Sequence, residues 1–218
     1  MKITFLGHSS FLLTTEDGTR ILTDPFDLSA YPGAMTYSPI TQSAEVVTVS
    51  HGHGDHQATH LVGGDPVIIR GNGKFVAAGV EFLGVAAYHD ENEGAERGEN
   101  TIFILRADGL SVAHFGDLGH VLSSDQAAEV GRVDVALIPI GGFFTIDAQQ
   151  AWKVAQQVDA RIIIPMHYSN KKCNFPIAGV EVFLADKPKV VRQGEPTVEI
   201  SPHNMPAEQT VIVLEPAL

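Results

Sequence analysis

The sequence predicts a layered α/β fold in a single domain that spans residues 1–218. The length of 218 residues suits one domain with one continuous core and is short for two full domains. Many short runs rich in valine, isoleucine, phenylalanine and threonine are separated by glycine, proline and Asp-Gly turns, as strands are. Only a few segments show helical spacing, so we expect sheets to dominate.

The first group of predicted strands covers the N-terminal half of the chain. Three runs joined by tight turns, one of which contains Asp17-Gly18, open this group. The group consists of KITFLG (2–7), SFLLTTE (10–16), RILTDPF (20–26), EVVTVS (45–50), PVIIR (66–70), KFVAAG (74–79) and VEFLGVAAYH (80–89).

The second group covers the C-terminal half and includes the predicted helices. Its strands are NTIFILRADG (100–109), LSVAHFG (110–116), VDVALIPI (133–140) and RIIIPMHY (161–168). The tail at 180–201 is also interpreted as strands. A helix is predicted at 147–158, where apolar residues recur at spacings of three and four, and a shorter helix at 123–130.

The composition excludes several classes of function. The formal net charge is −12, so nucleic acid and anionic membranes would be repelled at long range. The start of the chain lacks the apolar core and cleavage site of a signal peptide, and no apolar run has membrane-spanning length. One cysteine, Cys173, allows no internal disulfide, which fits a reducing compartment. We expect a cytoplasmic protein that acts on a small molecule, binds neither nucleic acid nor membranes, and can form a homo-oligomer.

The stretch HGHGDH, residues 51–56, contains three imidazoles and a carboxylate within six positions. Extended residues at positions i and i+2 project to the same side, so His51 and His53 can hold one ion. If a helix begins around Asp55, that carboxylate and His56 turn toward a second metal position nearby. The alternative interpretation is a polar surface loop. We take metal binding as the hypothesis.

The other ligand candidates also follow predicted strands. His51, His89, Asp117 and His167 each come just after a strand-like run. Strand ends at one edge of a sheet can converge on a single point. The remaining histidines, including His8, are interpreted as surface or hydrogen-bonded side chains rather than ligands.

Taken in order, HGHGDH, AYHDE, AHFGDLG and PMHY resemble the metallo-β-lactamase-fold hydrolases. The resemblance spans nearly the whole chain. It implies a four-layer αββα sandwich with two metal ions at one edge of the sheets. It also implies that Asp24, at the end of an early strand, hydrogen-bonds a ligand histidine and fixes its tautomer. A turn-forming aspartate before proline is the alternative interpretation of Asp24.

The resemblance implies a ligand set for each metal ion. The first ion would be held by His51, His53 and His89, and the second by Asp55, His56 and His167. Asp117 would bridge them. Histidine and aspartate ligands suit Zn²⁺, and Mn²⁺ or iron is compatible.

Departures from the pattern narrow the branch within the family. The commonest β-lactamases have cysteine where this chain has Asp117, and the di-iron flavoproteins have glutamate where it has His53. Between Asp117 and His167 there is too little chain for an inserted nucleic-acid-clamping domain. The chain is most similar to the compact branch that includes ascorbate-6-phosphate lactonase.

The expected function is hydrolysis of a small ester, lactone or phosphoester by a hydroxide that bridges two metal ions. Asp55 could orient this nucleophile. His120 and Tyr168, which neighbour predicted ligands, could donate a proton or bind an oxyanion, or could make only structural hydrogen bonds. The alternatives are an iron-dependent oxidoreductase of the same fold and a non-catalytic metal- or ligand-binding protein.

Two segments could contribute to substrate binding. The segment 139–150 contains a glycine-rich turn before a helix, where free N–H groups could hold an anion, although Asp147 would compete for them. Phe143 and Phe144 could wall the pocket or belong to the core. The charged segment 89–100 is expected to form a surface loop at the groove mouth, with Arg97 as a candidate contact for substrate charge.

Overall fold

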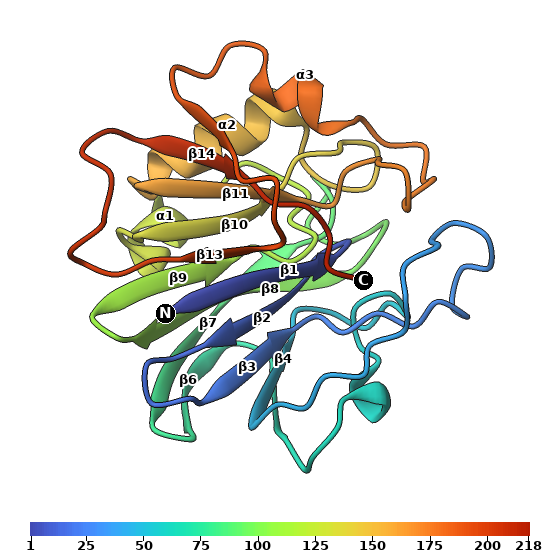
Figure 1. Cartoon of the computed structure of the whole chain (residues 1–218). Coiled ribbons are helices and arrows are strands. Elements are labelled where there is room, and N and C mark those ends of the chain that lie inside the picture. The colour runs from blue at the N-terminus through green and yellow to red at the C-terminus, as the bar shows by residue number, and fades with distance from the viewer.

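The computed structural model describes all residues, 1–218, as two β-sheets packed face to face (Figure 1). A cluster of 49 buried residues draws on both sheets and on the helices that cover one of them. The layered α/β fold predicted from the sequence is confirmed.

The smaller sheet has six strands in the order β13-β1-β2-β3-β4-β5. Its strands are β1 (Lys2–Gly7), β2 (Ser10–Thr14), β3 (Arg20–Thr23), β4 (Val46–Val49), β5 (Val67–Arg70) and β13 (Thr197–Glu199). The pairs from β13 to β3 are antiparallel, whereas β3, β4 and β5 are parallel. Strands β1, β3 and β4 therefore end at the same edge of the sheet.

The larger sheet has eight strands in the order β12-β14-β11-β10-β9-β8-β7-β6. Its strands are β6 (Gly73–Ala77), β7 (Val80–Tyr88), β8 (Glu99–Ala107), β9 (Leu110–His114), β10 (Val135–Pro139), β11 (Ile162–Met166), β12 (Val190–Arg192) and β14 (Thr210–Val213). Strands β9 to β12 and β14 run parallel, and β6 to β9 alternate. Strands β7, β9 and β11 consequently share the direction that brings their carboxyl ends to one edge.

Three α-helices pack beside the larger sheet (Figure 1): α1 (Ser124–Val130), α2 (Ala148–Gln157) and α3 (Val180–Leu184). Capping boxes begin the first two, Ser123 with Gln126 and Asp147 with Gln150, because each pair satisfies backbone N–H groups of the first turn. Both helices lie where the sequence predicts them.

The outer face of the smaller sheet carries no α-helix. Leu22 and Val47 on that face pack against Phe26 and Tyr37 from the long segment after β3, in a second cluster of 12 buried residues. Between β4 and β5 the only helical element is the 3₁₀ turn Thr59–Leu61. The conditional expectation of a helix around Asp55 is wrong, because a hydrogen-bonded turn from His53 to His56 stands there instead.

The interpretation of the tail 180–201 as strands is wrong for its first five residues. Helix α3 buries Phe183 and Leu184, and Phe183 packs edge-on against Trp152 of α2. Packing against a neighbouring helix outweighed the β-propensity of a valine- and phenylalanine-rich run. Strands β12 and β13 follow, as predicted for the remainder.

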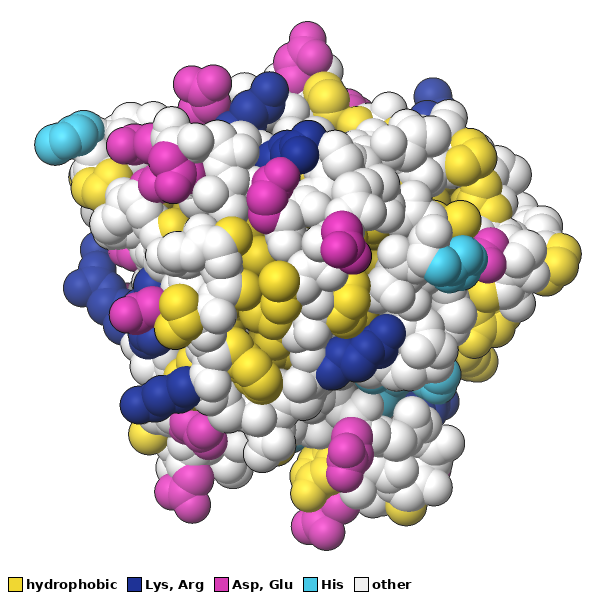
Figure 2. Space-filling model, turned by 90° about the horizontal axis from the view of Figure 1, so that it is seen from below, with side chains coloured by type: hydrophobic (Ala, Val, Ile, Leu, Met, Phe, Trp, Pro, Cys, Tyr) yellow, Lys and Arg dark blue, Asp and Glu magenta, His cyan; other side chains and the backbone are white.

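The surface of the molecule is mixed in charge. Figure 2 shows acidic side chains scattered over one face among basic and apolar ones. None of the helices is both long enough and apolar enough to cross a bilayer.

Candidate metal centre

Five strand ends meet in one place, where the two sheets share an edge. The smaller sheet supplies His8 after β1 and the HGHGDH segment after β4. The larger sheet supplies His89 after β7, Asp117 after β9 and His167 after β11. The convergence follows from the shared direction of these strands in each sheet.

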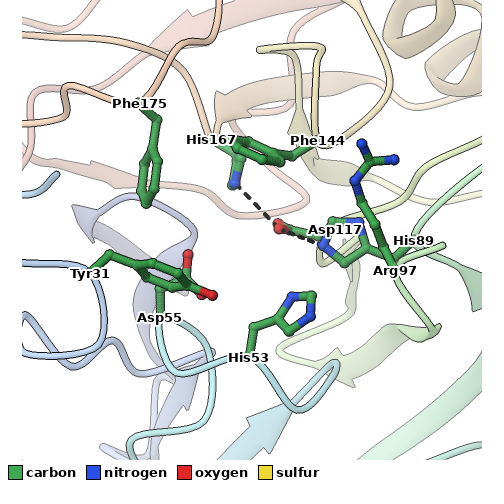
Figure 3. Close-up of a pocket in the computed structure, with 9 residues that line it drawn as sticks. All are labelled: Tyr31, His53, Asp55, His89, Arg97, Asp117, Phe144, His167 and Phe175. Atoms are coloured by element: carbon green, nitrogen blue, oxygen red, sulfur yellow. Dashed lines mark ion pairs between the residues drawn. The ribbon is translucent and has the colours of Figure 1, made fainter.

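Asp117 lies at the centre of this group. Its Oδ2 atom is 3.2 Å from His89 Nε2, 3.3 Å from His56 Nε2, 3.3 Å from His167 Nε2 and 4.0 Å from His51 Nε2. Figure 3 shows Asp117 between His89 and His167, which come from different strands. Four imidazole nitrogens thus approach one oxygen of a buried carboxylate.

The potential ligand atoms form three overlapping groups, each within 4.8 Å. The groups are His51, His53 and His89; His8, His56 and His167; and Asp24, His51 and His56. The first matches the ligand set that the family resemblance implies for one metal ion. The sequence-based candidates therefore come together in space, from segments separated by up to 116 positions between His51 and His167.

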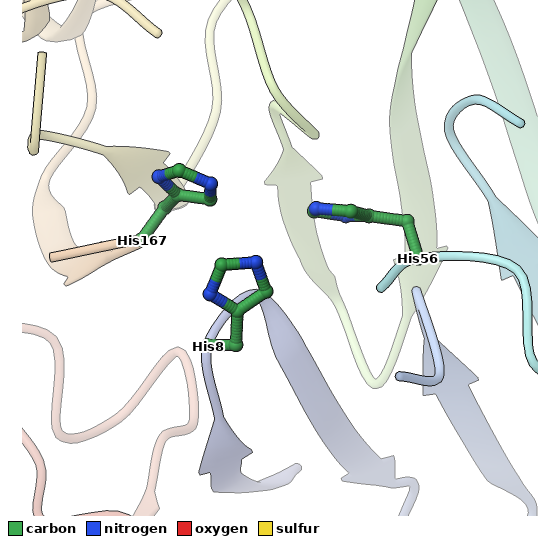
Figure 4. A group of neighbouring side chains, drawn as sticks. All are labelled: His8, His56 and His167. Atoms are coloured by element: carbon green, nitrogen blue, oxygen red, sulfur yellow. The ribbon is translucent and has the colours of Figure 1, made fainter. Parts of the chain in front are cut away.

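His8 is the functional candidate that sequence reasoning missed. Its ring is buried, its Nε2 lies 3.1 Å from Asp55 Oδ2, and its ring centroid is 4.4 Å from that of the tilted His167 ring (Figure 4). Its backbone has a φ of 54°, a conformation that a residue other than glycine adopts only when its surroundings hold it there. The available signal was its position directly after a strand, the same signal that identified the other ligands.

Asp24 fixes two of the candidate ligands at once. Its buried carboxylate accepts hydrogen bonds from His56 Nδ1 at 3.0 Å, from the Ser50 backbone N–H at 2.8 Å and from Ser50 Oγ. Because Ser50 Oγ donates to Asp24, it accepts from His51 Nδ1 at 2.9 Å. In its neutral form, each imidazole is thus held as the tautomer that carries its proton on Nδ1, so that the Nε2 lone pair is available to a metal ion. The predicted hydrogen bond between Asp24 and a histidine of this cluster is confirmed, with His56 as the donor.

The loop of Asp117 is held from behind by a buried asparagine. Asn100 accepts from the Asp117 backbone N–H at 3.0 Å and donates to the Phe115 carbonyl at 2.9 Å. The same loop packs directly on the His89 loop at Gly119, where a Cβ would lie only 2.2 Å from His89 and Asp90 backbone atoms. Glycine is needed there because no side chain fits between the loops.

The charges of the cluster are strongly coupled. Burial lowers the pKa of His51 to about 3 and that of His8 to about 4, aided by His56 and His167 respectively, so both imidazoles are neutral. Burial would also lower the pKa of His56, but the carboxylates of Asp117 and Asp55 outweigh it and raise that pKa well above its usual value. Burial would raise the pKa of Asp117, yet His167 and His56 hold it well below its usual range.

These side chains fit a metal ion on two observations. Asp117 Oδ1 is buried without any hydrogen-bond partner, which is costly unless another group satisfies it. The pKa of His56 is raised because the carboxylates of Asp117 and Asp55 face its ring, so this position favours a positive charge. A divalent ion supplies that charge, and neutral imidazoles with carboxylates are the ligands that Zn²⁺ accepts.

A cavity of about 200 Å³ opens over this cluster. Its floor is formed by His53, Asp55, His89, Asp117 and His167, and its rim by Tyr31, Arg97, Phe144 and Phe175. Arg97 thus lies at the groove mouth, as the sequence suggested for a contact with substrate charge, and Phe144 is part of the wall.

Three further candidates lie away from the cavity lining. His120 uses both ring nitrogens on backbone groups, accepting from the Tyr88 N–H at 3.1 Å and donating to the Val121 carbonyl at 2.9 Å. Tyr168 is buried in the main core, where burial and nearby Tyr37 raise its pKa. Asp147 caps α2 by accepting from Gln149 and Gln150, so the N–H groups considered for an anion are already occupied.

The sequence is similar to a known family and to proteins within it. Residues 2–167 match the family model for the β-lactamase superfamily domain. A UPF0173 metal-dependent hydrolase from Carboxydothermus hydrogenoformans is 33% identical over 218 residues, which cover 84% of this chain and 89% of the relative.

Solved structures agree in fold. The crystal structure of a metallo-β-lactamase superfamily protein from Thermotoga maritima has a TM-score of 0.81 and 37% identity, and the match covers 98% of each chain. CmlA, a di-iron β-hydroxylase from Streptomyces venezuelae, has a TM-score of 0.56 and 15% identity over 76% of this chain and 44% of its own. At that identity, the second likeness concerns the fold alone.

Proposed function

Because the chain belongs to the β-lactamase superfamily domain family, we propose that it hydrolyses a small ester, lactone or phosphoester at two metal ions held by this cluster. It is a metal-dependent hydrolase of the metallo-β-lactamase superfamily. The observation that carries the finer proposal is the convergence of four Nε2 atoms on Asp117 Oδ2.

The proposed ligand sets divide the cluster between two ions. His51, His53 and His89 would hold the first, and Asp55, His56 and His167 the second. Asp117 would bridge them, which its central position supports. We propose Zn²⁺ as the ion, with Mn²⁺ and iron as alternatives that the same donor atoms accept.

Bound divalent ions supply Lewis acidity, which makes water available as a nucleophile near neutral pH and polarises the oxygen of the bond under attack. The protein's own part is to position the reacting groups. Asp55 lines the cavity and is ionised, since His56 and His8 outweigh its burial and lower its pKa. Its carboxylate can therefore accept a hydrogen bond from the attacking water and orient it.

His8 would keep Asp55 in that orientation. With a pKa lowered to about 4, His8 is neutral at pH 7, and its Nε2–H can donate a hydrogen bond to Asp55 Oδ2. His120 and Tyr168 receive no step in this mechanism, because neither lines the cavity: His120 bonds two backbone groups and Tyr168 is buried in the main core.

The size of the cavity supports a small substrate. Its volume of about 200 Å³ is below the roughly 300–1,000 Å³ typical of pockets for drug-sized ligands. The acidic composition and the single cysteine support a cytoplasmic protein that acts on a metabolite rather than on nucleic acid or a membrane.

The test combines metal content with turnover. The protein is purified without added metal, its metals are counted by mass spectrometry, and hydrolysis of a panel of lactones, carboxylesters and phosphodiesters is measured before and after chelation. Near two zinc or manganese ions per chain with chelator-sensitive turnover would support the proposal. A single iron ion with oxygen uptake would favour an oxidoreductase, and metal without any turnover would favour a binding protein.

A further inference from the structure

The rim of the cavity has two chemically different sides. In Figure 3, Tyr31 and Phe175 lie on one side of Asp117, and Arg97 lies on the other. A substrate whose reacting bond lies above Asp117 would therefore contact aromatic rings at one end and a guanidinium at the other.

The aromatic side is a continuous wall. The ring of Phe175 is 5.7 Å from Tyr31 and 5.9 Å from Phe144, and both pairs are in edge-on contact. Tyr31 is 40% exposed although it is a large ring, so part of it remains open to the cavity mouth. Such rings favour a planar or apolar partner.

The charged side is built on an ordered loop. The Asp90 carboxylate accepts hydrogen bonds from four backbone N–H groups, those of Asn92, Gly94, Glu96 and Arg97, at 2.7 to 3.0 Å. A further bond joins the Gly98 N–H to the Gly94 carbonyl at 2.9 Å. One buried carboxylate thus folds the whole loop and fixes the backbone from which Arg97 projects.

The guanidinium of Arg97 has hydrogen-bond donors that no group of the protein occupies. Its single ion pair is with Glu96 at 3.5 Å, and that partner is 55% exposed, so the pair is weak. A guanidinium has five N–H donors, and a carboxylate or phosphate can occupy two of them in a fork. Arg97 is also the only arginine or lysine that lines the cavity.

We propose that the substrate carries a planar or apolar body, which packs on Tyr31 and Phe175, and a carboxylate or phosphate group, which binds Arg97. This inference rests on the proposed function, because it assumes that the reacting bond lies over the metal ligands. It narrows the substrate to a small anionic ester or lactone, and it makes Arg97 the residue that selects for the anion.

Equilibrium binding tests the inference without turnover. Isophthalate, a planar ring with two carboxylates, is compared by calorimetry with 3-carbamoylbenzoate, in which a neutral amide replaces one carboxylate, on the metal-loaded protein. One carboxylate of either ligand can occupy the metal end. We expect wild type to bind isophthalate about 10-fold or more tightly than the amide, since charge-assisted bonds are the stronger kind.

Variants of Arg97 test whether this side chain causes the preference for isophthalate. R97Q should bind both ligands equally, and R97K should retain part of the preference because lysine keeps the charge but loses the fork. R132Q is the matched control, because Arg132 is 62% exposed and pairs with Asp159 elsewhere. Phe175→Leu should lower the affinity for both ligands by a similar factor, about 3- to 10-fold, and leave the ratio of the two affinities unchanged. Unchanged preference in R97Q would overturn the inference.

Parallel assays separate this inference from the proposed function. Turnover of neutral esters, with R97Q and wild type showing the same ligand preference, would leave the hydrolase intact and remove the role of Arg97. Arg97-dependent binding, with no lactone, carboxylester or phosphoester of the panel hydrolysed, would support the ligand class and overturn the proposed reaction.

Discussion

The floor and the rim of the cavity differ in burial and in the contacts that hold their side chains. The floor residues Asp55, His89, Asp117 and His167 are buried, and second contacts hold the cluster from behind. The rim residues are partly exposed: Phe175 meets Tyr31 and Phe144, and Arg97 pairs only with the exposed Glu96. The comparison teaches that the chemistry is fixed by the core of the fold, whereas substrate choice depends on side chains that can change at little cost to it.

Removing the central carboxylate should break the floor most completely. Asp117→Asn keeps the shape but removes the charge that raises the pKa of His56. We expect loss of at least one metal ion per chain and a fall in hydrolysis of about 1,000-fold, since several kcal/mol of transition-state stabilisation depend on the metal site. Mass spectrometry and kinetics measure both. The exposed Asp65→Asn is the control, and full metal content in Asp117→Asn would refute the assignment.

Ser50→Ala tests the support behind the floor. The change removes the hydroxyl that links Asp24 to His51, but it leaves every proposed ligand in place. Loss of such outer support typically costs about 10- to 100-fold in metal affinity. Competition with a coloured chelator measures the affinity, with the exposed Ser29→Ala as control. An affinity equal to that of wild type would mean that the tautomer of His51 is fixed by other means.

The pH dependence of the free energy of unfolding should reveal the lowered pKa of His8. Its folded pKa of about 4 lies below the unfolded value of 6.5, so its stability contribution is complete above 6.5 and is lost as the pH falls toward 4. His8→Gln should therefore lose less stability than wild type between pH 7.5 and pH 5, by about 2 kcal/mol.

Denaturant unfolding of the metal-free proteins measures this difference. The comparison with wild type is needed because His56, whose pKa is raised, shifts stability in the opposite direction over the same range. Equal pH slopes in the two proteins would show that His8 is not held neutral.

The smallest effect is expected at the rim. Tyr31→Leu keeps an apolar side chain but removes the ring that meets Phe175. We expect KM to rise about 2- to 10-fold for aryl substrates, with metal content unchanged and stability within about 0.5 kcal/mol of wild type. A loss of metal in this variant would contradict the division between floor and rim.

Most of the candidate site could be predicted from local pattern. The HGHGDH segment and the positions of His89, Asp117 and His167 after strand-like runs brought seven candidates to one edge. The helix at 147–158 was predictable because its apolar residues recur at spacings of three and four, and the structure adds a capping box of Asp147 and Gln150 at its start. Helix α3 was not, because its five residues are too short to show a period and depend on packing against Trp152.

The sequence by itself determined the ligand chemistry and its order along the chain, since residue type and spacing decide which side chains can bind a metal ion. Only the tertiary structure decided which of the remaining histidines join the five predicted ligands. It brought His8 to Asp55 and directed the nitrogens of His120 to backbone groups instead of the cavity. The physical reason is that strand direction and loop packing set these distances through contacts between residues far apart in sequence.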